Sequence, residues 1–171
     1  MKLTRRLALA APLCLAGLSG RAATPVPSGL SALAIRSANI LSFHADGSRL
    51  FEFRAAFGRE SGAKRVRDDA RTPIGDYTLL PARRSARWRW FLPIDYPNES
   101  DIARGRAAGL SRGQLGDEIG VHGFGDWPPI DLAAGHGVGW NWTAGCISVT
   151  YAELEVIRTL VHRPIPIRIA P

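Results

Sequence analysis

Apolar and polar side chains alternate along several short segments of this chain, and this period of two predicts a fold made mainly of β-strands. Isoleucine at positions 165, 167 and 169 is the clearest case. Asp46-Gly47 stands between two apolar segments and predicts a tight hairpin. The expected strands cover residues 33–43, 50–57, 76–80, 87–96, 118–122, 147–149 and 165–169. One face of the fourth strand is expected to carry Trp88, Trp90, Leu92 and Ile94.

Two further segments carry helix signals. Thr150-Tyr151-Ala152-Glu153 is a capping box. It opens a segment with an apolar stripe at helical spacing, formed by Leu154, Ile157, Leu160 and Val161. Ser100 is expected to cap a shorter helix that runs through Ala108 and ends at Gly109. The expected architecture is therefore one mainly β domain with two short helices.

A long irregular segment, residues 124–142, lies before the last strands and is rich in glycine. A loop of this length inside a compact domain is usually functional or disordered. Its tryptophans are interpreted as walls of a ligand groove, and the alternative for at least one of them is core packing. These tryptophans are Trp127, Trp140 and Trp142.

The N-terminus has the order of a secretory signal peptide. Lys2, Arg5 and Arg6 precede an uncharged segment, and Gly20-Arg21-Ala22 places small residues around a cleavage site. A buried N-terminal helix is the alternative. Thr4-Arg5-Arg6 resembles the start of a twin-arginine signal, so both Sec and Tat export are open. The predicted organisation is a signal peptide over 1–22, a tether over 23–32 and a domain over 33–171, located in the periplasm or cell envelope.

Export changes the meaning of the charge. The whole chain has a formal net charge of +7, but cleavage after Ala22 removes four of the 22 basic residues and none of the 15 acidic ones, which leaves +3. That charge is ordinary for a globular domain, so no nucleic-acid partner is expected. We interpret a cluster of arginines as outward-facing residues of strands: Arg83, Arg84, Arg87 and Arg89. No apolar segment reaches the roughly 18 residues of a membrane span, so no integral membrane segment is expected after cleavage.

Cleavage also removes Cys14 and leaves Cys146 as the single cysteine. A lone thiol in an oxidising compartment has no internal disulfide partner, so it is either a buried structural residue or a nucleophile. Cys146 follows Gly145 at the end of the long loop, where the backbone N–H groups of both residues are expected to face a developing oxyanion. His122, at a strand end, is the expected base, and His136, between two glycines, is the alternative.

A zinc site is the chemical rival to this interpretation. Its ligands would come from His122, Asp126, Asp131, His136 and Cys146, but their spacing matches no compact zinc pattern. No metal and no cofactor are therefore expected.

These residues resemble a known family. His122-Gly123, followed after the loop by Thr143-Ala144-Gly145-Cys146-Ile147, is similar to the signature of the L,D-transpeptidase (YkuD-type) catalytic domain. Arg71-Thr72-Pro73-Ile74-Gly75-Asp76-Tyr77 resembles the TPxGxY/F element of that family. Residues 96–98, 119–123 and 141–146 are most similar to the YafK-like subgroup of murein L,D-transpeptidases. The resemblance extends over residues 33–169.

The resemblance implies a β-sandwich catalytic domain and an enzyme of peptidoglycan. Cys146 matches the family's acyl-accepting cysteine and His122 its general base. The cysteine of such enzymes attacks the L-centre carbonyl of meso-diaminopimelate in a stem peptide and expels D-alanine. An amine then resolves the thioester in transpeptidation, or water does so in hydrolysis. Some YafK-like members instead cut the bond between peptidoglycan and an envelope lipoprotein.

The chain departs from the family pattern at two positions. Many members have histidine at the position of Ala144 and arginine at that of Ser148. Another anchor for the substrate carboxylate is then needed, and Arg71 is the candidate. The expected substrate-binding residues are Arg71, Trp127, Trp142 and Thr143. A non-catalytic envelope binding module that kept the fold is the alternative to an enzyme.

Overall fold

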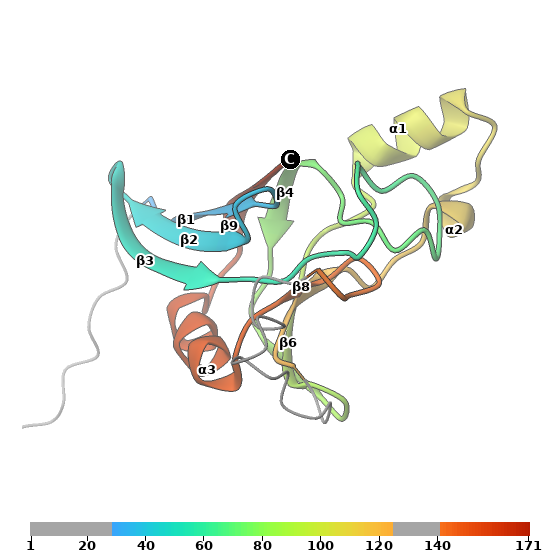
Figure 1. The fold of residues 1–171 in the computed structure, drawn as a ribbon. Helices are drawn as coiled ribbons and strands as arrows, with labels where there is room; N and C mark the ends of the chain where they lie inside the picture. The colour runs from blue at the N-terminus through green and yellow to red at the C-terminus, as the bar shows by residue number, and fades with distance from the viewer. Residues whose placement is uncertain (1–28, 125–140) are drawn as a thin grey trace, which may run out of the picture.

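The computed structural model describes residues 29–124 and 141–171. In this part of the chain, strands form two sheets and helices are few and short (Figure 1). The strands are β1 (Ser31–Ile35), β2 (Ile40–Ala45), β3 (Ser48–Arg54), β4 (Gly75–Leu79), β5 (Arg83–Ser85), β6 (Arg89–Pro93), β7 (Gly120–His122), β8 (Ile147–Ser148) and β9 (Ile165–Ala170). The helices are α1 (Glu99–Ala107), α2 (Arg112–Leu115) and α3 (Tyr151–Leu160). The expectation of a mainly β, two-sheet domain is confirmed.

The larger sheet has the order β3-β2-β1-β9-β4, and the smaller has the order β5-β6-β7-β8. The pairs β1–β9 and β7–β8 are parallel, and the other pairs are antiparallel. Two isolated backbone bridges connect the sheets. Leu79 of β4, in the larger sheet, pairs with Ile94, which follows β6 of the smaller sheet. Ala56, which follows β3 of the larger sheet, pairs with Ser148 of β8 in the smaller sheet. The bridge at Ser148 ties β8, which directly follows Cys146, to the segment after β3.

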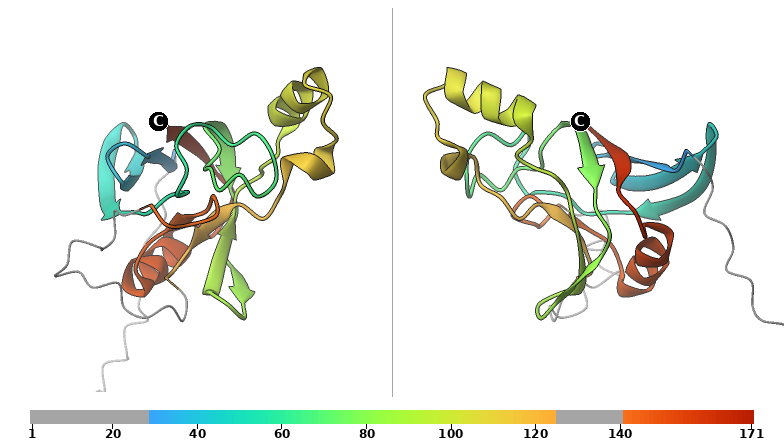
Figure 2. Two further views of the ribbon diagram at one scale, coloured as in Figure 1. Left: turned by 45° about the vertical axis from the view of Figure 1, so that its right-hand side comes forward. Right: turned by 180° about the vertical axis from the view of Figure 1, so that it is seen from behind.

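The core contains apolar side chains from both sheets and from one helix. Leu41, Leu79, Val121 and Ile147 are fully buried in one cluster with Leu154 and Ile157 of α3. Figure 2 shows α1 and α2 together on the side of the molecule away from α3. The buried stripe of α3 and the alternating burial of β9 are as the sequence predicted.

The hairpin between β2 and β3 turns at Asp46-Gly47, as predicted, and both residues have positive φ (49° and 78°). The prediction of one strand over 33–43 is wrong, because β1 and β2 are separate strands that pair antiparallel. Asn39 adopts a left-handed φ of 54° in the turn between them. Asparagine tolerates this conformation well, and its side chain donates to the Ala55 carbonyl (3.0 Å).

The capping box of α3 is confirmed, since Glu153 N–H donates to Thr150 Oγ1 (3.2 Å) and Thr150 N–H donates to Glu153 Oε2 (2.8 Å). The predicted cap of α1 is wrong by two residues. Asn98 Oδ1 accepts from Asp101 N–H, and Asp101 Oδ2 accepts from Asn98 N–H, both at 3.1 Å. Ser100 lies inside the helix instead. The single turn α2 had no signal in the sequence analysis.

Trp88 does not share a face with Trp90, contrary to the prediction. It lies in the turn of the β5–β6 hairpin, and Arg89 after it has a left-handed φ of 62°. This conformation breaks the alternation of a continuous strand. Trp88 therefore stacks against His122, whereas Trp90 contacts Glu155 of α3.

The predicted signal peptide and most of the predicted tether lie outside the described residues. β1 already begins at Ser31, so the expected domain start at residue 33 falls inside this strand. Across the two described ranges, no helix has the length and apolar character needed to cross a membrane.

Candidate active site

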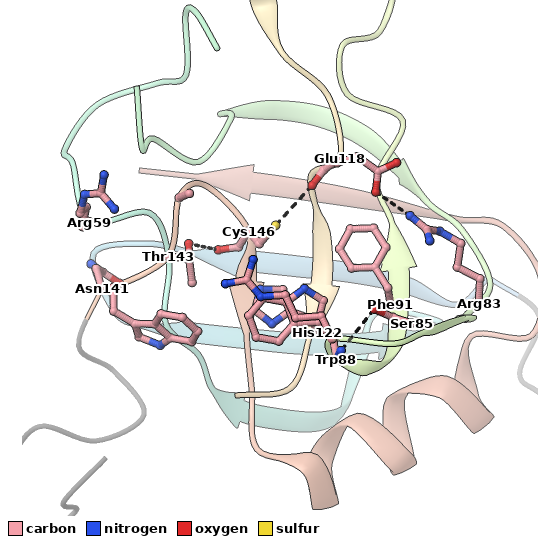
Figure 3. A pocket seen from close by; sticks show the side chains of 13 residues that line it. Arg59, Arg83, Ser85, Trp88, Phe91, Glu118, His122, Asn141, Thr143 and Cys146 are labelled. Atoms are coloured by element: carbon pink, nitrogen blue, oxygen red, sulfur yellow. Dashed lines mark hydrogen bonds and ion pairs between the residues drawn. The ribbon is translucent and has the colours of Figure 1, made fainter. Parts of the chain in front are cut away.

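A pocket of about 680 Å³ opens where the smaller sheet meets the loop before β8 (Figure 3). Cys146 and His122 both line it, although 24 positions separate them in the sequence. The β5–β6 hairpin forms another wall with Trp88 and Phe91. The complete lining is Arg59, Arg83, Ser85, Arg87, Trp88, Phe91, Glu118, His122, Asn141, Trp142, Thr143, Ala144 and Cys146.

His122 is the last residue of β7 and is only 2% exposed. Its ring lies against Trp88, with centroids 3.9 Å apart and planes 19° from parallel, and Phe91 flanks it at 6.4 Å. Its Nδ1 is hydrogen-bonded to the carbonyl oxygen of Gly123. A carbonyl oxygen only accepts, so Nδ1 carries the proton and Nε2 of the neutral ring has the free lone pair. The ring is therefore oriented as a base.

Cys146 immediately precedes β8, which pairs in parallel with β7 so that Ser148 lies opposite His122. In this parallel register Cys146 falls level with Gly120, two residues before His122, so the thiol and the imidazole lie on the same face of the sheet and line one pocket (Figure 3). Cys146 Sγ donates to the carbonyl oxygen of Glu118 at 3.4 Å. The resting thiol proton is thus directed at the backbone before β7.

Burial favours the neutral form of both groups at pH 7. It raises the pKa of Cys146 to about 11, and the Glu118 carboxylate adds to this effect, while the Gly120 amide, Lys64 and Arg87 oppose it. Burial also lowers the pKa of His122 to about 4 against the hydrogen bond to Gly123, and the positive charge of Arg87 lowers it further. The resting site is a neutral thiol beside a neutral imidazole rather than a thiolate–imidazolium pair.

The loop that presents Cys146 is held by Thr143, which is 3% exposed. Thr143 Oγ1 donates to the Cys146 carbonyl (2.6 Å) and accepts from Gly145 N–H (3.1 Å). The Thr143 backbone pairs with Phe57 and Arg59 on the other side. Thr143, expected to bind substrate, lines the pocket and also fixes the turn that carries Cys146.

Gly145 has a φ of 134°, and a Cβ at this position would lie 2.7 Å from the Arg71 carbonyl oxygen. Only glycine permits that close approach. The Gly145 amide, expected to face an oxyanion, already donates to Thr143. The Cys146 amide is the remaining member of the expected pair.

Arg71 does not line the pocket with its side chain, in contrast to the expected anchor role. It instead places its carbonyl against Gly145. The pocket arginines are Arg59, Arg83 and Arg87, of which only Arg83 has an acidic partner among the described residues, Glu118 at 2.5 Å. Arg83 and Arg87 are exposed, as the sequence predicted, and their additional place in the pocket wall was not predicted.

Asn141 is a site residue that the sequence analysis did not single out. Its Oδ1 accepts from Asn39 Nδ2 (2.7 Å) and from Phe57 N–H (2.8 Å), so the edge of the pocket is joined to the β1–β2 turn and to the segment after β3. Trp142, expected as a groove wall, lines the pocket and meets His122 edge-on at 6.0 Å. Trp127 and His136 lie outside the described residues.

Ala144 and Ser148, the two positions at which the chain differs from the family pattern, place no charged side chain in the pocket. Ala144 is exposed and lines it. Ser148 is fully buried, and its backbone pairs with Ala56 in both directions at 2.8 Å. In the described ranges, no group of three or more histidine, cysteine, aspartate or glutamate side chains is arranged to hold a metal ion.

The sequence that builds this fold and pocket matches the model of a known protein family. The family model described as YkuD, the L,D-transpeptidase catalytic domain, matches residues 32–167. The chain belongs to this L,D-transpeptidase family. The match covers both sheets, the pocket and α3 and thus includes Cys146 and His122.

Solved structures share the fold at low sequence identity. The helical cell shape determining protein Pgp2 of Campylobacter jejuni is 22% identical, with a TM-score of 0.63 over 82% of this chain and 47% of that one. An L,D-transpeptidase of Mycobacterium smegmatis is 14% identical, with a TM-score of 0.54 over 83% of this chain and 58% of that one. L,D-transpeptidase 3 of Mycobacterium tuberculosis, solved with a faropenem-derived adduct, is 19% identical, with a TM-score of 0.54 over 84% and 60%.

The chain therefore spans about half to three-fifths of the length of these solved structures. A comparison with curated proteins gives no significant match.

Proposed function

We propose that this chain is an exported, cysteine-dependent peptidoglycan L,D-transpeptidase that acts on stem peptides containing meso-diaminopimelate. The observation that carries the proposal is the convergence of Cys146 and His122 on one pocket in a chain of this family. The names of the structural neighbours point the same way, because they include L,D-transpeptidases and a cell shape determining protein. The N-terminal signal-peptide pattern supports a periplasmic location.

In the first half-reaction, His122 Nε2 takes the thiol proton while Cys146 Sγ attacks the carbonyl carbon of the L-centre of meso-diaminopimelate. The S–C bond forms, and the Cys146 amide donates to the oxyanion. When the tetrahedral intermediate collapses, the C–N bond to D-alanine breaks, and the imidazolium returns its proton to the leaving amine. The products are a thioester on Cys146 and free D-alanine.

In the second half-reaction, the amine of another stem peptide attacks the thioester and transfers its proton to His122. The new peptide bond forms, and the S–C bond breaks to restore the thiol. The imidazole of His122, with its pKa lowered to about 4, is unprotonated near pH 7, so its Nε2 lone pair is free to take a proton in each half-reaction.

Hydrolysis by water at the same thioester is the second candidate. It is favoured by the absence of an imidazole at Ala144 and of a guanidinium at Ser148, where many transpeptidating relatives carry them. The chain would then be an L,D-carboxypeptidase, or a YafK-like amidase that releases a lipoprotein from peptidoglycan.

Incubation of the mature protein with purified muropeptides, followed by mass analysis, tests the proposal. Transfer gives 3–3 crosslinks or exchanged terminal D-amino acids. Loss of the fourth residue or release of a linked protein, without amine incorporation, establishes the hydrolase. Cys146→Ser is expected to abolish either reaction, and His122→Ala to slow it by about 10²–10⁴-fold.

Faropenem provides an independent test of the nucleophile. The wild-type chain is expected to gain the mass of a faropenem fragment on Cys146, and Cys146→Ser is expected to gain none. A wild-type chain that reacts with neither faropenem nor any stem peptide is instead a non-catalytic binding module of the envelope.

A further inference from the structure

A second depression lies on the β5–β6 hairpin and α3, apart from the thiol. Its volume is about 500 Å³. Its lining consists of Arg84, Ser85, Arg89, Trp90, Glu155 and Arg158. Ser85 also lines the Cys146 pocket, so the two depressions share this hairpin.

The arginines of this depression are oriented by aromatic rings. The guanidinium carbons of Arg84 and Arg158 lie 4.0 Å and 4.6 Å from the ring centroid of Trp90. That of Arg89 lies 5.1 Å from the ring of Tyr151. A guanidinium stacked on a ring keeps the N–H donors along its edges available to a ligand. The donors are thus partly ordered before any anion arrives.

The single carboxylate in the depression is already occupied. Glu155 Oε1 accepts from Trp90 Nε1 (3.0 Å), and Oε2 accepts from Arg158 Nε. Arg84 and Arg89 form no ion pair with any residue in 29–124 or 141–171. Three positive charges therefore share one negative charge, and an external anion relieves their mutual repulsion.

We propose that Arg84, Arg89 and Arg158, gathered on Trp90 and Tyr151, bind the carboxylates of a second acidic peptide branch of the polymer on which Cys146 acts. The inference rests on the proposed function, because it takes the ligand to be a carboxylate-bearing peptidoglycan stem. A polymer with repeated acidic branches can place one branch at the thiol and another across the hairpin. Guanidinium forks suit carboxylates because they form paired hydrogen bonds.

Co-sedimentation of the full chain with purified insoluble peptidoglycan tests the proposal. All proteins carry Cys146→Ser so that turnover does not change the polymer. The test variant is Arg84→Gln/Arg89→Gln/Arg158→Gln. The matched control, Arg54→Gln/Arg106→Gln/Arg112→Gln, removes the same charge from exposed positions on β3, α1 and α2.

The test variant is expected to bind about tenfold more weakly, the sum of three exposed ion pairs of ordinary strength. The control triple is expected to stay within about twofold, since it keeps the aromatic-backed cluster. Peptidoglycan whose carboxylates have been amidated should bind wild type as weakly as intact polymer binds the test variant. Added salt should weaken the wild-type interaction, because it screens exposed charge.

Equal loss in the two triple variants would mean that only net charge matters and would overturn the proposal. Undiminished binding of amidated polymer would overturn it as well. Arginine-dependent binding to phosphatidylglycerol vesicles, without such binding to peptidoglycan, would assign the surface to a lipid instead.

Faropenem labelling separates this inference from the proposed function. With Cys146 restored, the Arg84→Gln/Arg158→Gln double variant, which leaves the turn at Arg89 intact, should label as fast as wild type, since neither arginine lines the Cys146 pocket. If wild type fails to label and to turn over but still sediments through these arginines, the enzyme proposal fails and the binding surface stands.

Discussion

The indole of Trp88 lies face to face on the imidazole of His122, with ring centroids 3.9 Å apart. The Gly123 carbonyl binds Nδ1 of the same ring. A backbone oxygen and an aromatic plane thus take the orienting role that a carboxylate has in many catalytic triads. The direction of Nε2 depends on Trp88, a turn residue of a different strand pair.

Replacement of Trp88 by alanine is expected to lower kcat by about 10–100-fold, because the imidazole loses the plane that fixes it. Trp88→Phe, which keeps an aromatic face, should retain most of the activity. Steady-state kinetics on a stem peptide, with circular dichroism to verify the fold, would check this. Equal rates in the alanine variant and wild type would show that Gly123 alone orients the ring.

The pH profile of acylation should reflect the shifted groups. His122 is neutral, and therefore a base, above its pKa of about 4, so the rate should be level around neutrality and fall only as pH drops through that value. An unperturbed histidine would give a half-maximal rate near pH 6.5. Single-turnover acylation by faropenem from pH 3.5 to 9 distinguishes the two.

Direct alkylation provides a second pH test. With its pKa raised to about 11, Cys146 contains little thiolate at pH 8.5, so iodoacetamide should modify it more slowly than the same cysteine in the urea-unfolded chain. Faster modification of the folded protein would show that the resting site is a thiolate.

Gly145→Ala is expected to destabilise the fold by roughly 2–4 kcal/mol and to remove activity, because the new Cβ meets the Arg71 carbonyl at 2.7 Å and the backbone holds a positive φ. Gly113→Ala is the matched control. A Cβ there has no heavy atom within 4 Å, and the residue lies in α2, so the change should be neutral or stabilising. Urea unfolding of both variants measures the difference.

Thr143→Val removes the hydroxyl that bridges the Cys146 carbonyl and the Gly145 amide while keeping the side-chain shape. We expect about 1–3 kcal/mol of lost stability from the two unpaired buried groups, with a fall in kcat. Thr143→Ser should restore both, because it keeps the hydroxyl. A valine variant with wild-type kinetics would contradict a role in presenting the thiol.

Arg59→Gln and Arg87→Gln are each expected to raise KM by about two- to fivefold for a stem peptide with a free carboxylate, since both line the pocket without an acidic partner in the described chain. The effect should vanish with the amidated peptide. Arg71→Gln should change KM less, because the Arg71 side chain does not line the pocket. A larger effect at Arg71 would restore the anchor that the sequence suggested.

Local sequence patterns were sufficient to predict the structure where residues adjacent in the sequence determine it. Asp46-Gly47 fixed a hairpin because few other residues adopt two positive φ values in succession. Thr150 and Glu153 satisfy each other's backbone, so their spacing alone marked the start of α3. The order of His122 and the segment from Thr143 to Cys146 was enough to indicate the family, which the family comparison confirmed.

The tertiary structure decided what depends on strands that are distant in sequence. The stacking of Trp88 on His122 follows from the pairing of β6 with β7 and from a left-handed turn at Arg89, and neither has a periodic signal. Arg59 and Arg87 line the pocket and Arg71 does not, and this too depends on how segments distant in sequence pack together. The pKa shifts of Cys146 and His122 are also tertiary in origin, because desolvation by the surrounding chain moves the thiol pKa up and the imidazole pKa down from their ordinary values.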